Sequence, residues 1–158
     1  MLPASHKETY GFSLTDVLII VAVIVVIGTL VMPRLLRSGL AAGEASAMDS
    51  VRLINTAEIT YASRYPDRGF TCALSALADK SNSPDPLLDP ALAARTKNGY
   101  HFLLSNCNGT PATSYLLVAV PTVPNQTGVR SFCSDQTGIV RYTADSATSC
   151  TANSRPVE

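Results

Sequence analysis

Four cysteines, Cys72, Cys107, Cys133 and Cys150, give the sequence its thiol chemistry. None of them stands in a Cys-x-x-Cys pair, so their spacing does not favour a zinc site. All four follow a long apolar segment, and an even number of cysteines in that position predicts two disulfides in an oxidising compartment. Three connectivities are possible. The alternative is four free, buried thiols in a cytosolic domain.

Asp16 is the single ionisable residue between Phe12 and Met32, a stretch of 21 residues. At about 1.5 Å per residue, a helix of that length spans about 31 Å, the thickness of the hydrocarbon layer of a membrane. A charge at the centre of a bilayer costs about 2.5 to 3.5 kcal/mol, so an acid in such a segment indicates a function. The alternative places Asp16 at the level of the lipid headgroups.

The residues around Asp16 resemble the N-terminus of a type IV prepilin. A short polar leader ends in Gly11, Phe12 follows, the acid takes the fifth place after the glycine, and Pro33 is the twenty-second residue counted from Phe12. The resemblance implies that a prepilin peptidase cuts after Gly11 and methylates the new amine of Phe12. The usual acid of the family is glutamate, and Asp16 is one methylene shorter.

The charges that such cleavage creates suggest a role for Asp16. The ammonium of Phe12 would head an apolar helix, where neither this group nor a carboxylate is stable alone. Asp16 is therefore expected to neutralise Phe12 of a neighbouring copy that is offset along the axis. The expected partners are other copies of the chain in a helical filament, the prepilin peptidase/methylase, the inner-membrane pilus assembly machinery and the membrane.

Composition divides the chain into three parts and argues against several functions. Residues 1–11 form the expected leader, residues 12–33 a transmembrane or filament-core helix, and residues 34–158 a globular domain. The 12 basic and 12 acidic residues balance, so nucleic acid is not an expected partner. His101 is typical of an ordinary strand residue, and the sequence contains no phosphate loop. We expect no enzyme activity, no cofactor and no metal.

The orientation of the globular domain is set by two competing signals. Arg34 and Arg37 follow the apolar segment, and the positive-inside rule alone would leave the domain in the cytoplasm. The cysteines and the processing motif require the opposite orientation. The expected location is the bacterial inner membrane before assembly, and afterwards an extracellular pilus or a periplasmic pseudopilus.

A long helix is predicted to continue beyond the apolar segment. Gly28 and Pro33 both weaken it, proline by about 3 kcal/mol, so we expect a kink or a melted segment between them. Apolar residues then recur at helical spacing, which predicts a helix to about Ser63. The expected inward side chains are Leu35, Leu36, Leu40, Met48, Val51, Ile54, Ala57 and Tyr61. Other faces are expected to carry Arg37, Glu44, Asp49, Arg52 and Glu58.

The second half of the chain predicts a sheet. Thr71 to Asp79 is expected to form a short helical turn. Four antiparallel strands are predicted over Tyr100–Ser105, Ser114–Val120, Val129–Ser134 and Ile139–Thr143. Their apolar face is expected to pack on the long helix through Phe102, Leu104, Leu116, Val118, Val129 and Ile139. The expected fold class is α+β, one long N-terminal helix on a four-stranded antiparallel sheet, and this layout resembles the pilin fold.

The resemblance also implies a disulfide pairing and a function. Cys133 and Cys150 would close a C-terminal loop like that of the family, and Cys72 would pair with Cys107. The implied function is a structural subunit of a type IV pilus, serving adhesion, twitching motility or DNA uptake. A pseudopilin of a type II secretion system is the alternative within the family. A monomeric, membrane-anchored binding module is the alternative outside it.

Overall fold

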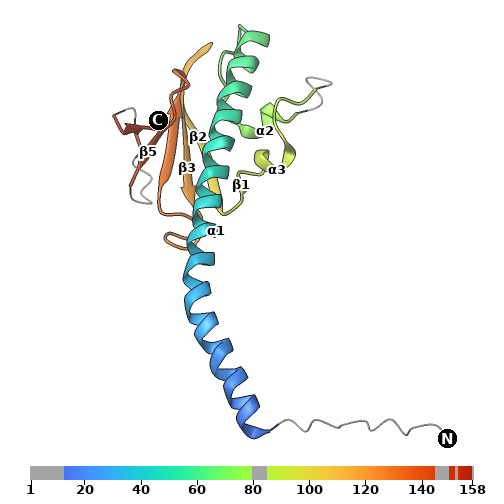
Figure 1. Cartoon of the computed structure of the whole chain (residues 1–158). Helices are drawn as coiled ribbons and strands as arrows, with labels where there is room; N and C mark the ends of the chain where they lie inside the picture. The colour runs from blue at the N-terminus through green and yellow to red at the C-terminus, as the bar shows by residue number, and fades with distance from the viewer. Residues whose placement is uncertain (1–12, 80–84, 145–149, 152, 158) are drawn as a thin grey trace, which may run out of the picture. The chain divides into compact units, whose positions relative to one another are not determined.

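The structure, a computed structural model, describes residues 13–79, 85–144, 150–151 and 153–157, without the side chains of residues 30–36. The chain divides into two compact units, Met1–Arg37 and Ser38–Glu158. The helix α1, Leu14–Arg64, contributes to both units, and the other described elements belong to the second (Figure 1).

α1 ends where the sequence prevents its continuation. Tyr65 follows the last helical residue and precedes Pro66, and a residue before proline disfavours the helical conformation. This end confirms the predicted boundary near Ser63. A membrane-spanning helix was expected over residues 12–33. In the described part of the chain, no helix is both long enough and apolar enough to cross a membrane.

The sheet of the second unit has six antiparallel strands in chain order. The four predicted strands are present as β2 (Tyr100–Gly109), β3 (Ala112–Pro121), β4 (Ser131–Asp135) and β5 (Arg141–Thr143). The predicted number is nevertheless wrong, because β1 (Thr96–Lys97) and β6 (Arg155–Pro156) extend the sheet at its two edges. Strands of two residues are too short to produce a periodic pattern.

Two short helices, α2 (Leu74–Leu77) and α3 (Pro90–Ala93), come between α1 and the sheet in the sequence. α2 confirms the helical turn predicted over Thr71–Asp79, and its two leucines are buried. α3 is capped by Asp89, whose Oδ1 accepts a hydrogen bond from the backbone N of Ala91 at 2.8 Å. Both helices add buried leucines to the main core.

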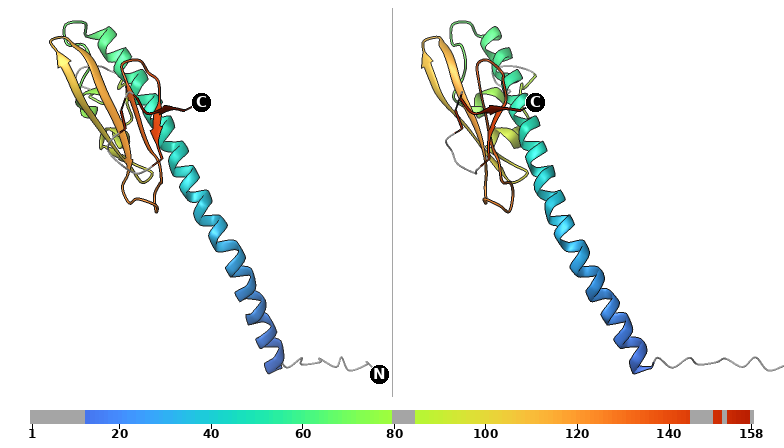
Figure 2. Two further views of the ribbon diagram at one scale, coloured as in Figure 1. Left: turned by 90° about the vertical axis from the view of Figure 1, so that its left-hand side faces the viewer. Right: turned by 60° about the vertical axis from the view of Figure 1, so that its left-hand side comes forward.

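The main core lies between the second-unit part of α1 and one face of the sheet, as both views of Figure 2 show. α1 contributes Ala47, Val51, Ile54, Ala57 and Tyr61. Glu44 and Glu58 are buried on this same stripe, so the prediction that they lie on other faces is wrong. Asp49 and Arg52 are exposed, as predicted. We call residues 44, 47, 51, 54, 58 and 61 the inner stripe of α1.

The face of β3 that packs on α1 is opposite to the predicted face. Phe102 is buried in the core, and Leu104 packs against it, as predicted. In β3, however, the core residues are Tyr115, Leu117 and Ala119 rather than Leu116 and Val118. β3 is apolar on both faces, so alternation alone does not distinguish them, and an error of one residue exchanges the faces.

The other face of the sheet carries a second, smaller apolar cluster. It consists of Val118, Cys133 and Cys150, with Leu116 and Val120 packed against them. The disulfide therefore covers the outer side of β3. Val129 and Ile139, predicted to face α1, are 39% and 45% exposed, because β4 and β5 begin only after them.

Gly128 marks a close approach between the turn before β4 and the ring of Tyr100. A Cβ atom at position 128 would collide with the hydroxyl, Cζ and Cε2 atoms of Tyr100. The same hydroxyl donates a hydrogen bond to the carbonyl oxygen of Arg130 at 2.9 Å. Glycine at position 128 is therefore required for the buried ring to fit.

Candidate functional site

The start of α1 is fixed by two local hydrogen bonds. The backbone N of Ser13 donates to Oδ2 of Asp16 at 3.1 Å, and Oγ of Ser13 accepts from the N of Thr15 at 3.4 Å. This arrangement is a capping box, in which a side chain in the first turn reaches back to the residue before the helix. Asp16 is exposed, so its carboxylate is accessible while it caps the helix.

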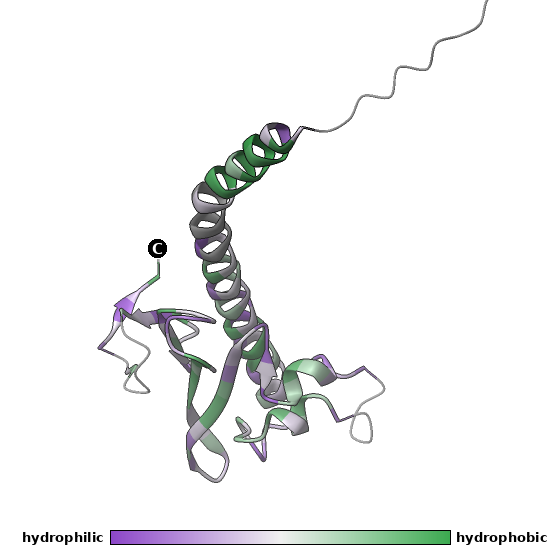
Figure 3. Ribbon diagram, turned by 90° about the horizontal axis from the view of Figure 1, so that it is seen from below, coloured by the Kyte–Doolittle hydropathy of each residue, from purple (hydrophilic) through white to green (hydrophobic). Residues whose placement is uncertain are grey.

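The segment after Asp16 exposes apolar side chains on every side. The ten large apolar residues between Val17 and Ile27 are each between 49% and 68% exposed. Since they occupy consecutive positions of a helix with 3.6 residues per turn, they point in all directions around the axis. Figure 3 shows the hydrophobic colour of this part of α1. An apolar surface of this extent indicates a contact site for another apolar surface.

The remaining predicted residues of the N-terminal motif are only partly described. Gly11 and Phe12 lie outside the described residues, so the cleavage and methylation sites stay predictions. Gly28 lies within α1, and a Cβ atom there would meet nothing within 4 Å. The backbone is helical at Gly28 and at Pro33. The kink or melted segment expected between them stays a prediction.

The structure forms two disulfides with the expected connectivity. Cys72 pairs with Cys107, which joins the segment after α1 to β2. Cys133 of β4 pairs with Cys150. The two bonds lie at different layers of the second unit, since Cys107 packs against the main core whereas Cys133 and Cys150 belong to the outer cluster.

Glu44, on the inner stripe, is hydrogen-bonded through both of its carboxylate oxygens. Its Oε1 accepts hydrogen bonds from the backbone N of Val129 at 2.9 Å and of Arg130 at 3.1 Å. Its Oε2 lies 2.7 Å from both Nε and Nη2 of Arg130. Burial alone would raise the pKa of Glu44, but the hydrogen bonds from Val129 and Arg130 and the charge of Arg130 together lower it.

Glu58 occupies an equivalent place two heptads further along the inner stripe, with far fewer partners. The residue is fully buried, and its Oε2 accepts one hydrogen bond, from the backbone N of Thr71 at 2.9 Å. Its Oε1 is buried without a hydrogen-bond partner among the described residues. Burial raises the pKa of Glu58 to about 7, and the Thr71 hydrogen bond opposes this shift only in part.

A polar bridge crosses the core between these two acids. The Nδ2 atom of Asn55 donates to Oγ of Ser134 at 2.7 Å, and its Oδ1 accepts from the hydroxyl of Tyr115 at 2.9 Å. Oγ of Ser134 donates in turn to the carbonyl oxygen of Ile139 at 3.0 Å. The bridge thus ties α1 to β3 and β4. The pKa of Tyr115 is raised, and burial of its ring is the largest cause.

Sequence reasoning missed the buried acids, although a signal for them exists. The inner stripe alternates steps of three and four residues, which is the spacing of one helix face. Glu44 and Glu58 fit this spacing together with Val51. Both acids were expected on other faces, and charged residues are indeed rarely buried without a partner. Glu58 is bonded to the backbone N of Thr71, and Glu44 to two backbone N atoms and to Arg130, which is far away in the sequence.

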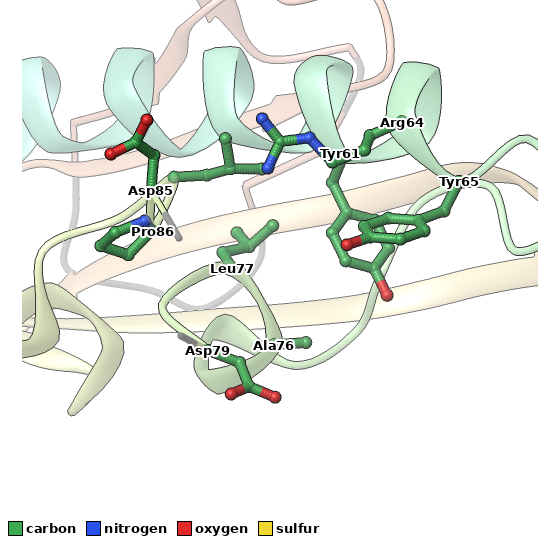
Figure 4. Close-up of a pocket in the computed structure, with 9 residues that line it drawn as sticks. Tyr61, Arg64, Tyr65, Ala76, Leu77, Asp79, Asp85 and Pro86 are labelled. Carbon is green, nitrogen blue, oxygen red and sulfur yellow. The ribbon is translucent and has the colours of Figure 1, made fainter. Parts of the chain in front are cut away.

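A cavity of about 10 Å³ lies at the end of α1. Figure 4 shows residues that line it, among them Tyr61, Tyr65 and Leu77. This volume holds about one water molecule, whereas sites for small molecules measure about 300 to 1,000 Å³. Within the described ranges, no three His, Cys, Asp or Glu side chains are grouped as a metal site would require. Two larger hollows, of about 530 Å³ beside Tyr142 and about 320 Å³ beside Leu116, lie open on the surface of the second unit. We take the apolar segment that follows Asp16 as the candidate for function because of its ten exposed large apolar side chains.

No protein-family model matches the chain, and a search of curated proteins finds no match.

Proposed function

We propose that the chain is a structural subunit of a filament of the type IV pilus kind, joined to other copies through the apolar part of α1. The observation that carries this proposal is the run of exposed apolar side chains from Val17 to Ile27, directly after the capping acid Asp16. A surface of this kind is stable only when lipid or further apolar side chains cover it. Copies of the same helix supply such a cover when they pack side by side.

Asp16 supplies the register in this proposal. After cleavage behind Gly11, the ammonium of Phe12 on one copy would pair with the Asp16 carboxylate of another. In an apolar helix bundle, breaking such a pair leaves an uncompensated charge, at a cost of about 3 to 5 kcal/mol. The pair would therefore select one axial offset between neighbouring helices.

The second unit suits the exposed part of such a filament. Its two disulfides are of the kind that persists in oxidising compartments, outside the cytoplasm. We further propose that a prepilin peptidase/methylase processes the chain at the inner membrane and that an assembly machinery there extracts it into the filament. The role is structural rather than catalytic.

The charge of Asp16 can be tested separately from its capping role. Asp16→Asn keeps an oxygen that can accept the Ser13 hydrogen bond but removes the charge. We expect it to lower the yield of filaments sheared from cells at least tenfold while the protein accumulates normally, because an unpaired Phe12 ammonium disfavours packing. Asp49→Asn, an exposed position later in α1, is the matched control and should leave the yield unchanged.

Two results would contradict the proposal at different levels. A wild-type yield from Asp16→Asn would exclude the pairing role. Absence of sheared filaments from wild-type cells, together with an intact mass that retains the leader, would exclude the filament function itself. A mass that begins at methylated Phe12 would support it.

A further inference from the structure

Glu58 is a buried carboxyl group that filament assembly does not use. The residue is 0% exposed, and a single hydrogen bond, from the backbone N of Thr71, reaches it. A buried carboxylate needs several donors to offset the loss of water. With Oε1 unpartnered among the described residues, the ionised form of Glu58 is a poorly supported buried charge, and protonation removes that charge.

The ionisable groups near Glu58 do not neutralise it. Tyr115 of β3 interacts with Glu58 and with Asp135, the last residue of β4, and both acids raise the pKa of the phenol rather than supply a positive charge. On the side of the turn after α1, Arg68 is exposed, and its guanidinium lies over the ring of Tyr65 at 5.3 Å. The described residues contain no ion-pair partner for Glu58.

We call the segment of residues 70–73 the strap, and several connections hold it in place, among them the ring of Phe70 on Tyr115, with centroids 4.9 Å apart. The backbone N of Phe70 donates to the carbonyl oxygen of Ala112 at 3.0 Å. Cys72 is bonded to Cys107 of β2. Thr71, between them, is bonded to Glu58, so the middle of the strap depends on this carboxyl group. The strap is partly exposed: Thr71 is half-buried and Cys72 is exposed.

We propose that Glu58 is a proton-controlled latch, which holds the strap against α1 when the carboxyl is protonated and releases it when the proton is lost. An ionised Glu58 gains stability only by reaching water. The strap is neither helix nor sheet, and the disulfide limits how far it can move. Opening is therefore local: the Thr71 hydrogen bond breaks while the Glu44 end of the core stays closed. This inference is independent of the proposed function.

The range over which the latch acts lies near neutral pH. Burial raises the pKa of Glu58 from an ordinary 4.5 to about 7, whereas in the open state the carboxyl regains its ordinary pKa. The closed state thus binds the proton more tightly. Opening becomes more favourable as the pH rises from about 5 and levels off above about 7.

Hydrogen exchange at the Thr71 amide tests the latch. The full chain in nonionic detergent is measured at pH 5 and pH 8, and each rate is corrected for intrinsic exchange. Linkage predicts that the protection of the Thr71 amide falls about 70-fold over this range. The backbone amide of Arg130, bonded to Glu44, should keep its protection. An equal fall at both amides, or no fall at Thr71, would overturn the proposal.

Two further measurements identify the titrating group. In Glu58→Gln the protection of Thr71 should no longer depend on pH, whereas the matched variant Glu44→Gln should keep the wild-type dependence. Should Glu58→Gln not fold, the carboxyl ¹³C shift of Glu58 in the wild-type chain gives the answer directly. A midpoint near pH 7 supports the latch, and a midpoint near 4.5 rejects it.

Discussion

Glu44 and Glu58 lie on the same stripe of the same helix, yet their surroundings favour opposite charge states. Glu44 accepts hydrogen bonds from two backbone N atoms and from the guanidinium of Arg130, and its pKa is lowered. Glu58 accepts one hydrogen bond, and burial raises its pKa to about 7. Burial alone therefore does not determine whether an acid in a core is charged; the number of donors that reach it does.

The difference arises in the segments that face the two acids. Val129 and Arg130 directly precede β4, and the guanidinium of Arg130 lies over the rings of Phe132 at 5.7 Å and Tyr142 at 5.5 Å. The sheet thus holds this cation in position for Glu44. Thr71 belongs to the strap, which offers one backbone N–H and no cation. The same helix therefore has a rigid contact at one end of the core and a titratable one at the other.

The largest expected effect comes from removing the disulfide that restrains the strap. Cys72→Ala with Cys107→Ala should lower the free energy of unfolding by about 4 kcal/mol, and Cys133→Ala with Cys150→Ala by about 3 kcal/mol, because the closed loops differ in length. Denaturant unfolding of the full chain in detergent measures both. The first pair should also move the pKa of Glu58 toward 4.5 by admitting water, and leave that of Glu44 low. If this variant changed the pKa of Glu44 and left that of Glu58 unchanged, the assignment of the titratable contact to Glu58 would be wrong.

Glu44→Ala is expected to destabilise the protein by about 3 kcal/mol. The substitution leaves the backbone N atoms of Val129 and Arg130 without their acceptor and removes the partner of a held cation. Denaturant unfolding at pH 7 measures the loss. Asp49→Ala is the control, since the Asp49 ion pair with Arg52 at 3.4 Å is exposed and contributes less than about 0.5 kcal/mol. Equal losses from the two variants would contradict the assigned role of Glu44.

The pH dependence of stability should separate the two acids by sign. Because the folded state binds the Glu58 proton more tightly than the unfolded chain, the free energy of unfolding should fall by about 2 to 3 kcal/mol between pH 5 and pH 8. Glu44 acts the other way: its contribution is present above pH 4.5 and is lost as the pH falls through its lowered pKa. Denaturant titrations at several pH values measure both. Glu58→Gln should abolish the fall between pH 5 and 8, and a fall that persists in this variant would assign it to another group.

For the second unit, the positions of helices and strands were predicted better than the face of each strand that is buried against α1. The end of α1, the α2 turn and the positions of β2 to β5 each follow from local signals such as Pro66 and alternation. Local signals did not indicate which side chains of β3 point toward α1. Leu116 to Val120 are apolar without interruption, so either face of the strand could pack on the helix. Two-residue strands such as β1 form because a longer neighbour pairs with them, and this leaves no periodic pattern.

For the candidate site, the residue types were predictable and their local contacts were not. The apolar run after Asp16 is evident from composition, and its exposure agrees with a contact surface. The capping bond of Asp16 to Ser13 was missed, although a serine three residues before an acid is a sequence signature of helix starts. Glu58 was expected on the outside, and nothing in the sequence indicates its burial, since its donor is a backbone N–H, which every residue except proline carries.

The close fit between Gly128 and Tyr100 also constrains which substitutions these two positions can accept during evolution. Any side chain at position 128 would meet the ring of Tyr100, so neither position can change freely while the other stays. A lineage that gains alanine at position 128 should carry a smaller side chain at position 100, and the hydrogen bond to the carbonyl of Arg130 would disappear with it. The two positions should therefore vary together among relatives, even where the remaining sequence has diverged.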